Sequence, residues 1–325
     1  MKLSIIVSFY KNYHLNIFDN LKKSINKDVE FIFMIDDLYP EDYQKIYEIK
    51  KVYSDQIQLV FHKKRSGTGR NYFDAIRYAK GEYVSFVSVS TVTGETDLNK
   101  LVDVLNKNDA DVIEFQPFWD RKIDWYPKQR LEPNKVYKTI ENPAFIALSY
   151  PIIFNKVFKK DLFKSIDSSQ VLLSNSKYSI SLLYNLLINA KTYLYLNVNF
   201  RKYLVHSEKT FSLNNFIKEW KLIDENDNVK SQFTAEIEYA KHYFFVVFLP
   251  ALVSEILKTS YLKRIAASKQ SISEKMEIEI DKFFEKQKFL EFQNNKYLKN
   301  NLLEISLMKK RTSKKDWKDI FEKLQ

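Results

Sequence analysis

Hydrophobic residues in the first third of the chain follow two patterns that alternate along the sequence. Short, mainly apolar runs rich in Val, Ile and Phe are typical of buried strands, and apolar residues spaced three or four apart are typical of helices. The runs predict strands at residues 3–9, 29–35, 57–61, 83–87 and 111–115, and the spaced pattern predicts helices near residues 18–25, 43–47, 72–79 and 98–105. This alternation predicts an α/β fold with a mostly parallel sheet.

The pattern changes after residue 115. Residues 116–206 open with prolines and aromatics that exclude a long regular element, so we expect loops over a cleft there. Helices near residues 160–163 and 181–188 and a strand at 192–198 are expected to follow. Residues 207–325 have apolar residues at helical spacing and few strand signals, which predicts an α-helical C-terminal region.

Composition narrows the possible functions. With 325 residues, 45% hydrophobic and 29% charged, the chain can fold around a substantial core, which excludes a disordered protein. The 52 Lys+Arg and 41 Asp+Glu residues give a net charge of +11, which favours partners that carry phosphate. The absence of cysteine excludes disulfides, a thiolate nucleophile and a Cys-ligated metal. We find no signal-peptide pattern and no apolar stretch long enough to span a bilayer, and we expect a cytoplasmic protein.

Candidate chemistry gathers where the predicted strands end, which is where open parallel sheets bind ligands. The first strand leads into Ser8 and the residues after it, the second into Asp36 and Asp37, and the third into residues 62–71. That third segment, His-Lys-Lys-Arg-Ser-Gly-Thr-Gly-Arg-Asn, places four cations beside two glycines at the start of a helix, a position that favours an anion such as a diphosphate. Taken singly, paired aspartates also occur as helix caps and basic runs as solvated surfaces.

In this order along the chain, these segments resemble the family 2 glycosyltransferases of bacterial type, nucleotide-sugar enzymes of the GT-A fold. The likeness rests on residues 3–12, on residues 31–37 with their paired aspartates, on Gly-Thr-Gly-Arg-Asn at 67–71 and on Gly-Glu-Tyr-Val at 81–84. It implies a Rossmann-like, mostly parallel sheet with helices on both faces. The donor half would be residues 1–115, the acceptor half residues 116–206, and residues 207–325 a helical addition.

The resemblance also implies a UDP-sugar donor and the residues that bind it. Asp37 would hold the base or the ribose, and Ser8 and Tyr10 would line the base pocket. Arg70 and Asn71 would lie near the sugar diphosphate, and the basic residues Lys63, Lys64 and Arg65 would supply further charge. The sugar would pass, with inversion, to a glycan or lipid acceptor.

Two features of the family are missing. Where the family has Asp-x-Asp for a divalent metal ion, this chain has Ser88-Val89-Ser90, and no carboxylate lies between Glu82 and Glu95, so we expect no metal cofactor. The family's general base is also missing from its usual place, since no acidic residue lies between Asp167 and Glu208. Loop carboxylates could replace the base, and the candidates are Asp120, Asp124, Glu132 and Glu141.

His206 follows the last predicted strand, in a segment similar to a family loop that folds over the diphosphate. Together with Arg201 and Lys202, it could replace part of the metal's charge. An ordinary surface histidine is the alternative.

Two functions therefore stay open: a metal-independent inverting glycosyltransferase, and a catalytically inactive GT-A pseudoenzyme that acts as partner or regulator of an active transferase. We expect no nucleic-acid partner, because no nucleic-acid-binding motif is present.

Near the C-terminus, basic residues adjoin apolar ones, which points to a membrane surface or a partner protein and to a peripheral position at the inner face of the membrane. The basic residues are Lys309, Lys310, Arg311, Lys314 and Lys315, and the apolar ones Trp317, Ile320, Phe321 and Leu324.

Overall fold

A computed structural model of the chain describes residues 1–9, 26–63, 65–88, 98–119, 129–171, 178–200, 202–203, 213–249 and 294–299. The chain divides into two compact units, one of residues 1–145 and 152–204 and one of residues 146–151 and 205–325. No helix in the described part of the chain has the length and apolar character needed to cross a bilayer.

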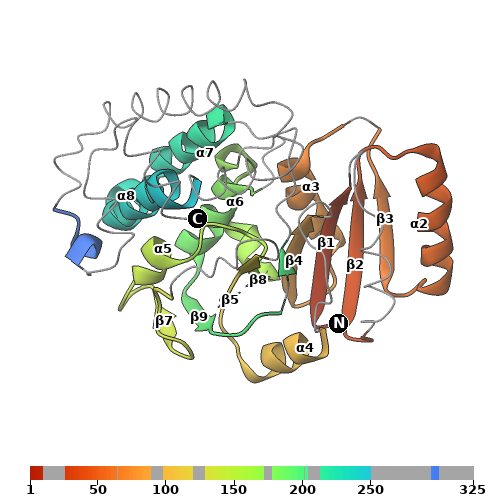
Figure 1. The fold of residues 1–325 in the computed structure, drawn as a ribbon, viewed down its shortest axis with the longest axis horizontal. Coiled ribbons are helices and arrows are strands. Elements are labelled where there is room, and N and C mark those ends of the chain that lie inside the picture. The colour runs from red at the N-terminus through yellow and green to blue at the C-terminus, as the bar shows by residue number, and fades with distance from the viewer. Residues whose placement is uncertain are drawn as a thin grey trace. The chain divides into compact units, whose positions relative to one another are not determined.

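An eight-stranded mixed sheet forms the centre of the first unit (Figure 1). Its strand order is β3-β2-β1-β4-β8-β5-β9-β7, with β1 to β4, β5 and β9 running in one direction and β7 and β8 in the other. The strands are β1 (Leu3–Phe9), β2 (Val29–Ile35), β3 (Ile57–Phe61), β4 (Tyr83–Ser88), β5 (Val112–Phe115), β7 (Val136–Lys138), β8 (Lys156–Lys159) and β9 (Thr192–Leu196). Two further short strands, β6 (Phe118–Trp119) and β10 (Lys202–Tyr203), pair with each other.

Helices connect and cover the strands. In the described part of the first unit the α-helices are α2 (Pro40–Val52), α3 (Thr68–Ala75), α4 (Leu98–Lys107) and α6 (Ile180–Asn189), and α5 (Ala144–Leu148) spans a boundary between the units. Short 3-10 helices follow at η1 (Ile76–Tyr78), η2 (Lys160–Ser165) and η3 (Ser168–Gln170). Helix α3 packs against β1 and β2, and α2 packs against β3. In α4 the four residues at helical spacing, Leu98, Leu101, Val102 and Leu105, are all buried, so its amphipathic pattern determines its orientation.

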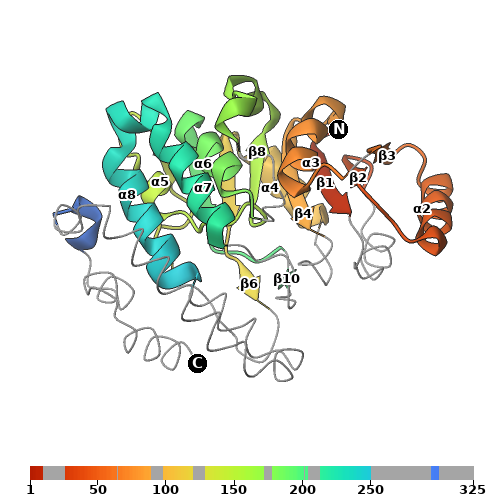
Figure 2. The same ribbon diagram turned by 90° about the horizontal axis from the view of Figure 1, so that it is seen from above.

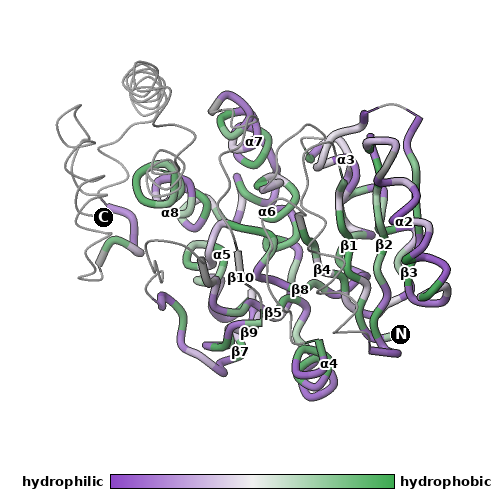
Figure 3. Tube along the Cα trace, turned by 45° about the vertical axis from the view of Figure 1, so that its right-hand side comes forward, coloured by the Kyte–Doolittle hydropathy of each residue, from purple (hydrophilic) through white to green (hydrophobic). Residues whose placement is uncertain are grey.

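The core of the first unit lies around the two central strands. All seven residues of β2 are buried, including the polar Glu30, and Figure 3 shows β1 and β2 mainly in the colour of hydrophobic residues. Glu30 is satisfied by neighbours: Ser4 Oγ donates to its Oε1 over 2.6 Å and Gln58 Nε2 donates to its Oε2 over 2.8 Å. The Gly81 backbone N–H donates in turn to Ser4 Oγ over 2.8 Å. This network ties the starts of β1, β2 and β3 to the turn before β4.

The second unit is helical where it is described. Helices α7 (Leu213–Glu225) and α8 (Thr234–Tyr243) lie side by side (Figures 1 and 2), and π-helices η4 (Val229–Phe233) and η5 (Phe244–Phe248) flank α8. A 3-10 turn, η6 (Lys296–Lys299), also packs against α8. Trp220 and Phe216 of α7 contact Phe244, and Lys241 donates to both oxygens of Asp224 at 3.0 and 2.9 Å.

The predicted fold class is confirmed: the sheet is mostly parallel, and helices alternate with the strands at the positions expected in the first 115 residues. The expected helix at residues 18–25 lies outside the described residues. The prediction was incomplete after residue 115, because β7 and β8 were not expected. The segment expected to be helical near residues 160–163 is a 3-10 helix that begins directly after β8.

Candidate functional site

Four parallel strands, β1 to β4, end at one edge of the sheet, which we call the carboxyl edge. Ser8 lies next to the end of β1, Asp36 directly follows β2, and His62 directly follows β3. In the register of the sheet, Ser8 is opposite Met34 of β2 and Ser88 of β4. The structure therefore brings the ends of strands far apart in sequence to the edge where open sheets bind ligands.

Ser8 and Asn71 are in direct contact at this edge. Asn71 lies in the first turn of α3, is fully buried, and donates from Nδ2 to Ser8 Oγ over 3.0 Å. Its carbonyl oxygen Oδ1 is also buried, and among the described residues no donor reaches it. An unsatisfied buried acceptor costs about 1–3 kcal/mol. This oxygen is therefore suited to accept a hydrogen bond from a ligand.

The paired aspartates have different surroundings. The side chain of Asp36 is 2% exposed, and both its oxygens have partners: His62 Nδ1 lies 2.9 Å from Oδ1, and the Gly67 N–H donates to Oδ2 over 3.0 Å. The Asp36 N–H also donates to the Phe9 carbonyl over 3.1 Å. Asp37, the next residue, is half-buried. Both oxygens of Asp36 are thus used in contacts within the protein, and Asp37 is the aspartate with a partly exposed side chain.

The basic loop, residues 62–67, connects β3 to α3. Lys63 and Arg65 are exposed, and Lys64 lies outside the described residues. Gly67 ends the loop with a φ of 88°, a left-handed conformation that favours glycine, and it occupies the N-cap of α3. Backbone N–H groups at the start of a helix, next to two exposed cations, make an environment for an anion.

Arg70 lies in the first turn of α3, three residues after Gly67. Its Nε donates to Asp74 Oδ2 over 2.6 Å, and its side chain is 46% exposed. The two residues are four apart on α3, a spacing at which opposite charges pair weakly on a helix surface.

The residues at the end of β4 do not fit a divalent metal ion. Mg²⁺ and Mn²⁺ prefer carboxylate oxygens, whereas the sequence supplies Ser88-Val89-Ser90 at this position. Nearby Asp36 already uses both oxygens in protein contacts. Within the described ranges, no group of three or more His, Asp or Glu side chains could hold a metal ion.

Two of the four loop carboxylates are described, and both look like ordinary surface residues. Glu132 pairs with Lys135 at 2.8 Å and Glu141 with Lys138 at 2.9 Å, and both carboxylates are largely exposed. The hydrogen bond that Lys135 donates to Glu132 raises the pKa of Lys135. These pairs flank β7, at the opposite end of the sheet from β3.

Other predicted site residues lie outside the described residues: Tyr10, Lys64, Ser90, Asp120, Asp124, Arg201 and His206. For Ser88 and Lys202 only the backbone is described, in β4 and β10 respectively. The roles assigned to these residues stay predictions.

A buried charged cluster joins β5, β8 and β9, and sequence reasoning did not single it out. Lys156 Nζ lies 3.3 Å from Glu114 Oε1 and donates to Asn155 Oδ1 and to the Ile152 carbonyl, each over 2.9 Å. Tyr193 donates its hydroxyl to the other oxygen of Glu114. Burial lowers the pKa of Lys156 to about 8, although Glu114 acts in the opposite direction. The available signal was a single acidic residue inside the apolar run Val-Ile-Glu-Phe.

Comparison with known proteins gives a family by sequence and similar structures by fold. The sequence model of Glycosyl transferase family 2 matches residues 4–167. Among solved structures, S. aureus TarS residues 1–349 superposes with a TM-score of 0.58 at 15% identity, covering 79% of this chain and 80% of that one. Its complexes with UDP (16% identity, 79% and 80% covered) and with UDP-GlcNAc (14%, 79% and 81%) both give 0.56. At these identities the likeness shows the fold, which is GT-A-like. No curated protein matches the sequence.

Proposed function

Because the chain belongs to glycosyl transferase family 2, we propose that it binds a UDP-sugar at the carboxyl edge and transfers the sugar to a glycan or lipid acceptor. The observation that carries the proposal is the meeting of Ser8, the unsatisfied oxygen of Asn71 and the basic loop at one edge. These groups offer a hydrogen-bond acceptor for a hydroxyl of the donor and cations for its diphosphate.

The uridine nucleotide is supported by the relatives. S. aureus TarS has been solved in complex with UDP and with UDP-GlcNAc, and its fold is the one that this chain shares. We therefore choose UDP-GlcNAc as the first donor to test. Asp37, Ser8 and Tyr10 form the proposed nucleoside side of the site, and Arg70 and Asn71 form the side near the sugar diphosphate.

The proposed reaction is a single displacement. An acceptor hydroxyl attacks the anomeric carbon, the bond from that carbon to the diphosphate oxygen breaks, and UDP leaves with the electron pair while the configuration inverts. The hydroxyl proton passes to a base, for which Asp120, Asp124 and His206 are the candidates. Cations of the basic loop, together with Arg70, stabilise the negative charge on UDP in place of a metal ion.

Calorimetric titration with UDP, in EDTA and then in Mn²⁺, tests donor binding. We expect the affinity for UDP to be the same in EDTA and in Mn²⁺. Arg70→Ala should weaken binding by about tenfold or more, because a charge-assisted hydrogen bond contributes about 1.5–3 kcal/mol. Arg77→Ala is the matched control, since Arg77 is an exposed arginine a short way along the same helical segment and lies against Tyr78. Absence of UDP binding at millimolar concentration would contradict the proposal.

Turnover is tested by release of UDP from UDP-GlcNAc matched to a glycosylated product. The missing base favours the second candidate function, an inactive partner of another transferase, since no acidic residue lies between Asp167 and Glu208. Tight UDP binding without turnover on any glycan or lipid acceptor, in Mn²⁺ as well as in EDTA, would favour the inactive partner. Turnover in EDTA would favour the enzyme.

A further inference from the structure

We propose that His62 is a positioning residue: through Asp36 it holds the basic loop in the conformation that receives the diphosphate of the donor. This inference rests on the proposed function, because it assumes a diphosphate at the carboxyl edge. It goes beyond that function by assigning a role to a histidine and an aspartate that touch no ligand in the proposal.

The geometry begins with one buried carboxylate that contacts both ends of the loop. Asp36 Oδ1 lies 2.9 Å from His62 Nδ1 at the start of the loop, and Oδ2 accepts the Gly67 N–H over 3.0 Å at its end. We call these two contacts the Asp36 bridge. Since each oxygen serves one end, losing either contact removes the side-chain tie between that end of the loop and Asp36.

The backbone at both ends is also held. The His62 N–H donates to the Ile35 carbonyl over 3.0 Å, and the Asn71 N–H donates to the Gly67 carbonyl over 2.9 Å in the first turn of α3. The Asp36 side chain is 2% exposed and that of His62 13%, so water competes weakly for the bridge. Between these two ends of the loop, the side chains of Lys63 and Arg65 are exposed.

The proposed function of the Asp36 bridge is to hold the loop that carries the cations in place before the diphosphate binds. A long cationic side chain binds a phosphate best when its backbone is already in place, since less conformational freedom is then lost on binding. The Asp36 bridge holds the backbone on both sides of Lys63 and Arg65, whose side chains are exposed. A looser loop would keep the same net charge but would present it to the diphosphate less often.

Two substitutions at His62 separate the hydrogen bond from the volume of the ring. His62→Leu removes the donor to Asp36 and keeps an apolar side chain of moderate size. His62→Asn keeps an N–H close to the position of Nδ1, so it can still donate to Asp36. We expect His62→Leu to weaken UDP binding about tenfold, equal to about 1.4 kcal/mol, and His62→Asn to restore affinity to within about threefold of the native chain.

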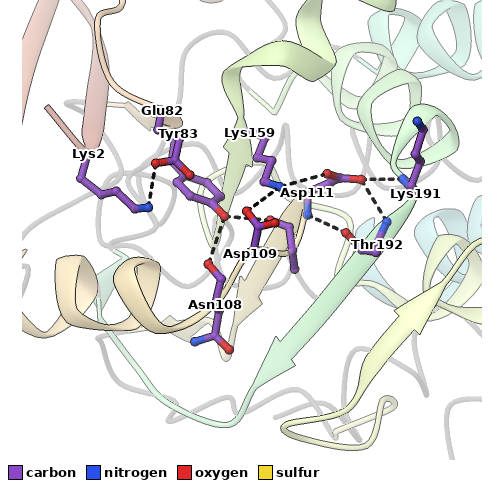
Figure 4. A network of polar contacts seen from close by, with 10 residues as sticks. Lys2, Glu82, Tyr83, Asn108, Asp109, Asp111, Lys159, Lys191 and Thr192 are labelled. Carbon is purple, nitrogen blue, oxygen red and sulfur yellow. Dashed lines mark hydrogen bonds and ion pairs between the residues drawn. The ribbon is translucent and has the colours of Figure 1, made fainter.

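The control removes a similar bridge at the other edge of the sheet. Asp111 Oδ2 accepts the backbone N–H groups of Lys191 and Thr192 over 2.8 and 3.0 Å, at the amino ends of β5 and β9 (Figure 4). Asp111→Ala should lower thermal stability as His62→Leu does but leave UDP affinity unchanged. Equal losses of affinity in these two variants would show a general effect of stability and overturn the inference.

Salt dependence supplies a readout that a purely structural role would not change. Phosphate contacts made by exposed cations weaken as salt rises. We expect the affinity of the native chain for UDP, and for inorganic pyrophosphate as a second probe, to fall with NaCl, and the fall to be shallower in His62→Leu. A native chain that binds pyrophosphate but not UDP would contradict the UDP proposal. The affinities of the native chain and His62→Leu for pyrophosphate would then decide the inference about the Asp36 bridge. Binding of neither would overturn both, and UDP binding with His62→Leu unaffected would overturn the inference alone.

Discussion

Gly81 occupies a position where the backbone leaves no room for a side chain. It precedes β4 and lies against the start of β1, where a Cβ atom would come within 2.6 Å of the Ser4 nitrogen and 2.7 Å of the Leu3 carbonyl carbon. Both are backbone atoms of a central strand, so relief requires β1 or the turn to move. Glycine is therefore required at position 81 because a side chain has no space beside β1, where β1 pairs with β4.

We expect Gly81→Ala to lower the free energy of unfolding by about 1–3 kcal/mol, the usual cost of overpacking a core. Urea unfolding followed by circular dichroism measures it. Lys80→Ala is the control because the Lys80 side chain is exposed, and it should change stability by less than about 0.5 kcal/mol. Equal urea midpoints for Gly81→Ala and the native chain would contradict the expectation.

His242 should make the stability of the second unit depend on pH. Burial lowers its pKa to about 3, and its Nδ1 hydrogen-bonds to the Glu238 carbonyl over 2.9 Å. In the unfolded chain the histidine takes up a proton below about pH 6.5, while the folded chain does not until about pH 3. Since the unfolded state then binds more protons, stability is lost as pH falls through this window, by up to about 1.4 kcal/mol per pH unit.

We expect His242→Phe, which cannot titrate, to show a shallower loss of stability than the native chain between pH 6.5 and pH 5. Denaturant unfolding at several pH values measures both slopes. Equal slopes would mean that the pH dependence in this range comes from other groups.

At the scale of elements, the antiparallel strand β8 between β4 and β5 depends on buried polar contacts. Lys156, at the start of β8, contacts Glu114 of β5, and its carbonyl accepts a hydrogen bond from Ser85 Oγ of β4 over 2.9 Å. One residue therefore connects β8 to both of its neighbours.

Lys156→Met should destabilise the protein by about 3–5 kcal/mol, because it removes a cation that lies 3.3 Å from the buried carboxylate of Glu114. Adding Glu114→Gln to that variant should recover part of the loss, since the remaining side chain is neutral. Thermal and urea unfolding of both variants test this. A double variant less stable than Lys156→Met alone would show that the pair is not the main contribution of Lys156.

The elements that were predicted and those that were not differ in where their stability comes from. Strands β1 to β4 follow from apolar runs that are visible locally, and they begin and end within one residue of expectation. Strand β8 has four residues with a lysine at each end, and its pairing rests on residues of β4 and β5 far earlier in the chain. The same holds at the site: the segments that gather at the carboxyl edge were visible, but the contact of Asp36 with His62, 26 residues later, depends on the pairing of β2 with β3.

At the scale of the whole molecule, the net charge of +11 should govern association with anionic surfaces. The basic residues Lys309 to Lys315 and the apolar residues after them lie outside the described residues, so the proposal for them rests on sequence. Each near-surface cation contributes about 1 kcal/mol on anionic lipid.

Deleting residues 309–325 should reduce co-sedimentation with vesicles that contain phosphatidylglycerol and have little effect with phosphatidylcholine alone. The native chain at high salt is the control, because screening should give the same loss. Undiminished binding after the deletion would remove the membrane role of this segment.

The position of β8 also has a consequence for how the protein is made. During synthesis, β1 to β4 can pair with one another as they leave the ribosome, but β5 has no partner until β8 and β9 follow. Until residue 159 has emerged, β4 is an open strand edge, which is a site for wrong pairing with other chains. A nascent chain stalled before that residue should therefore be a substrate for chaperones, and one stalled well beyond residue 196 should not.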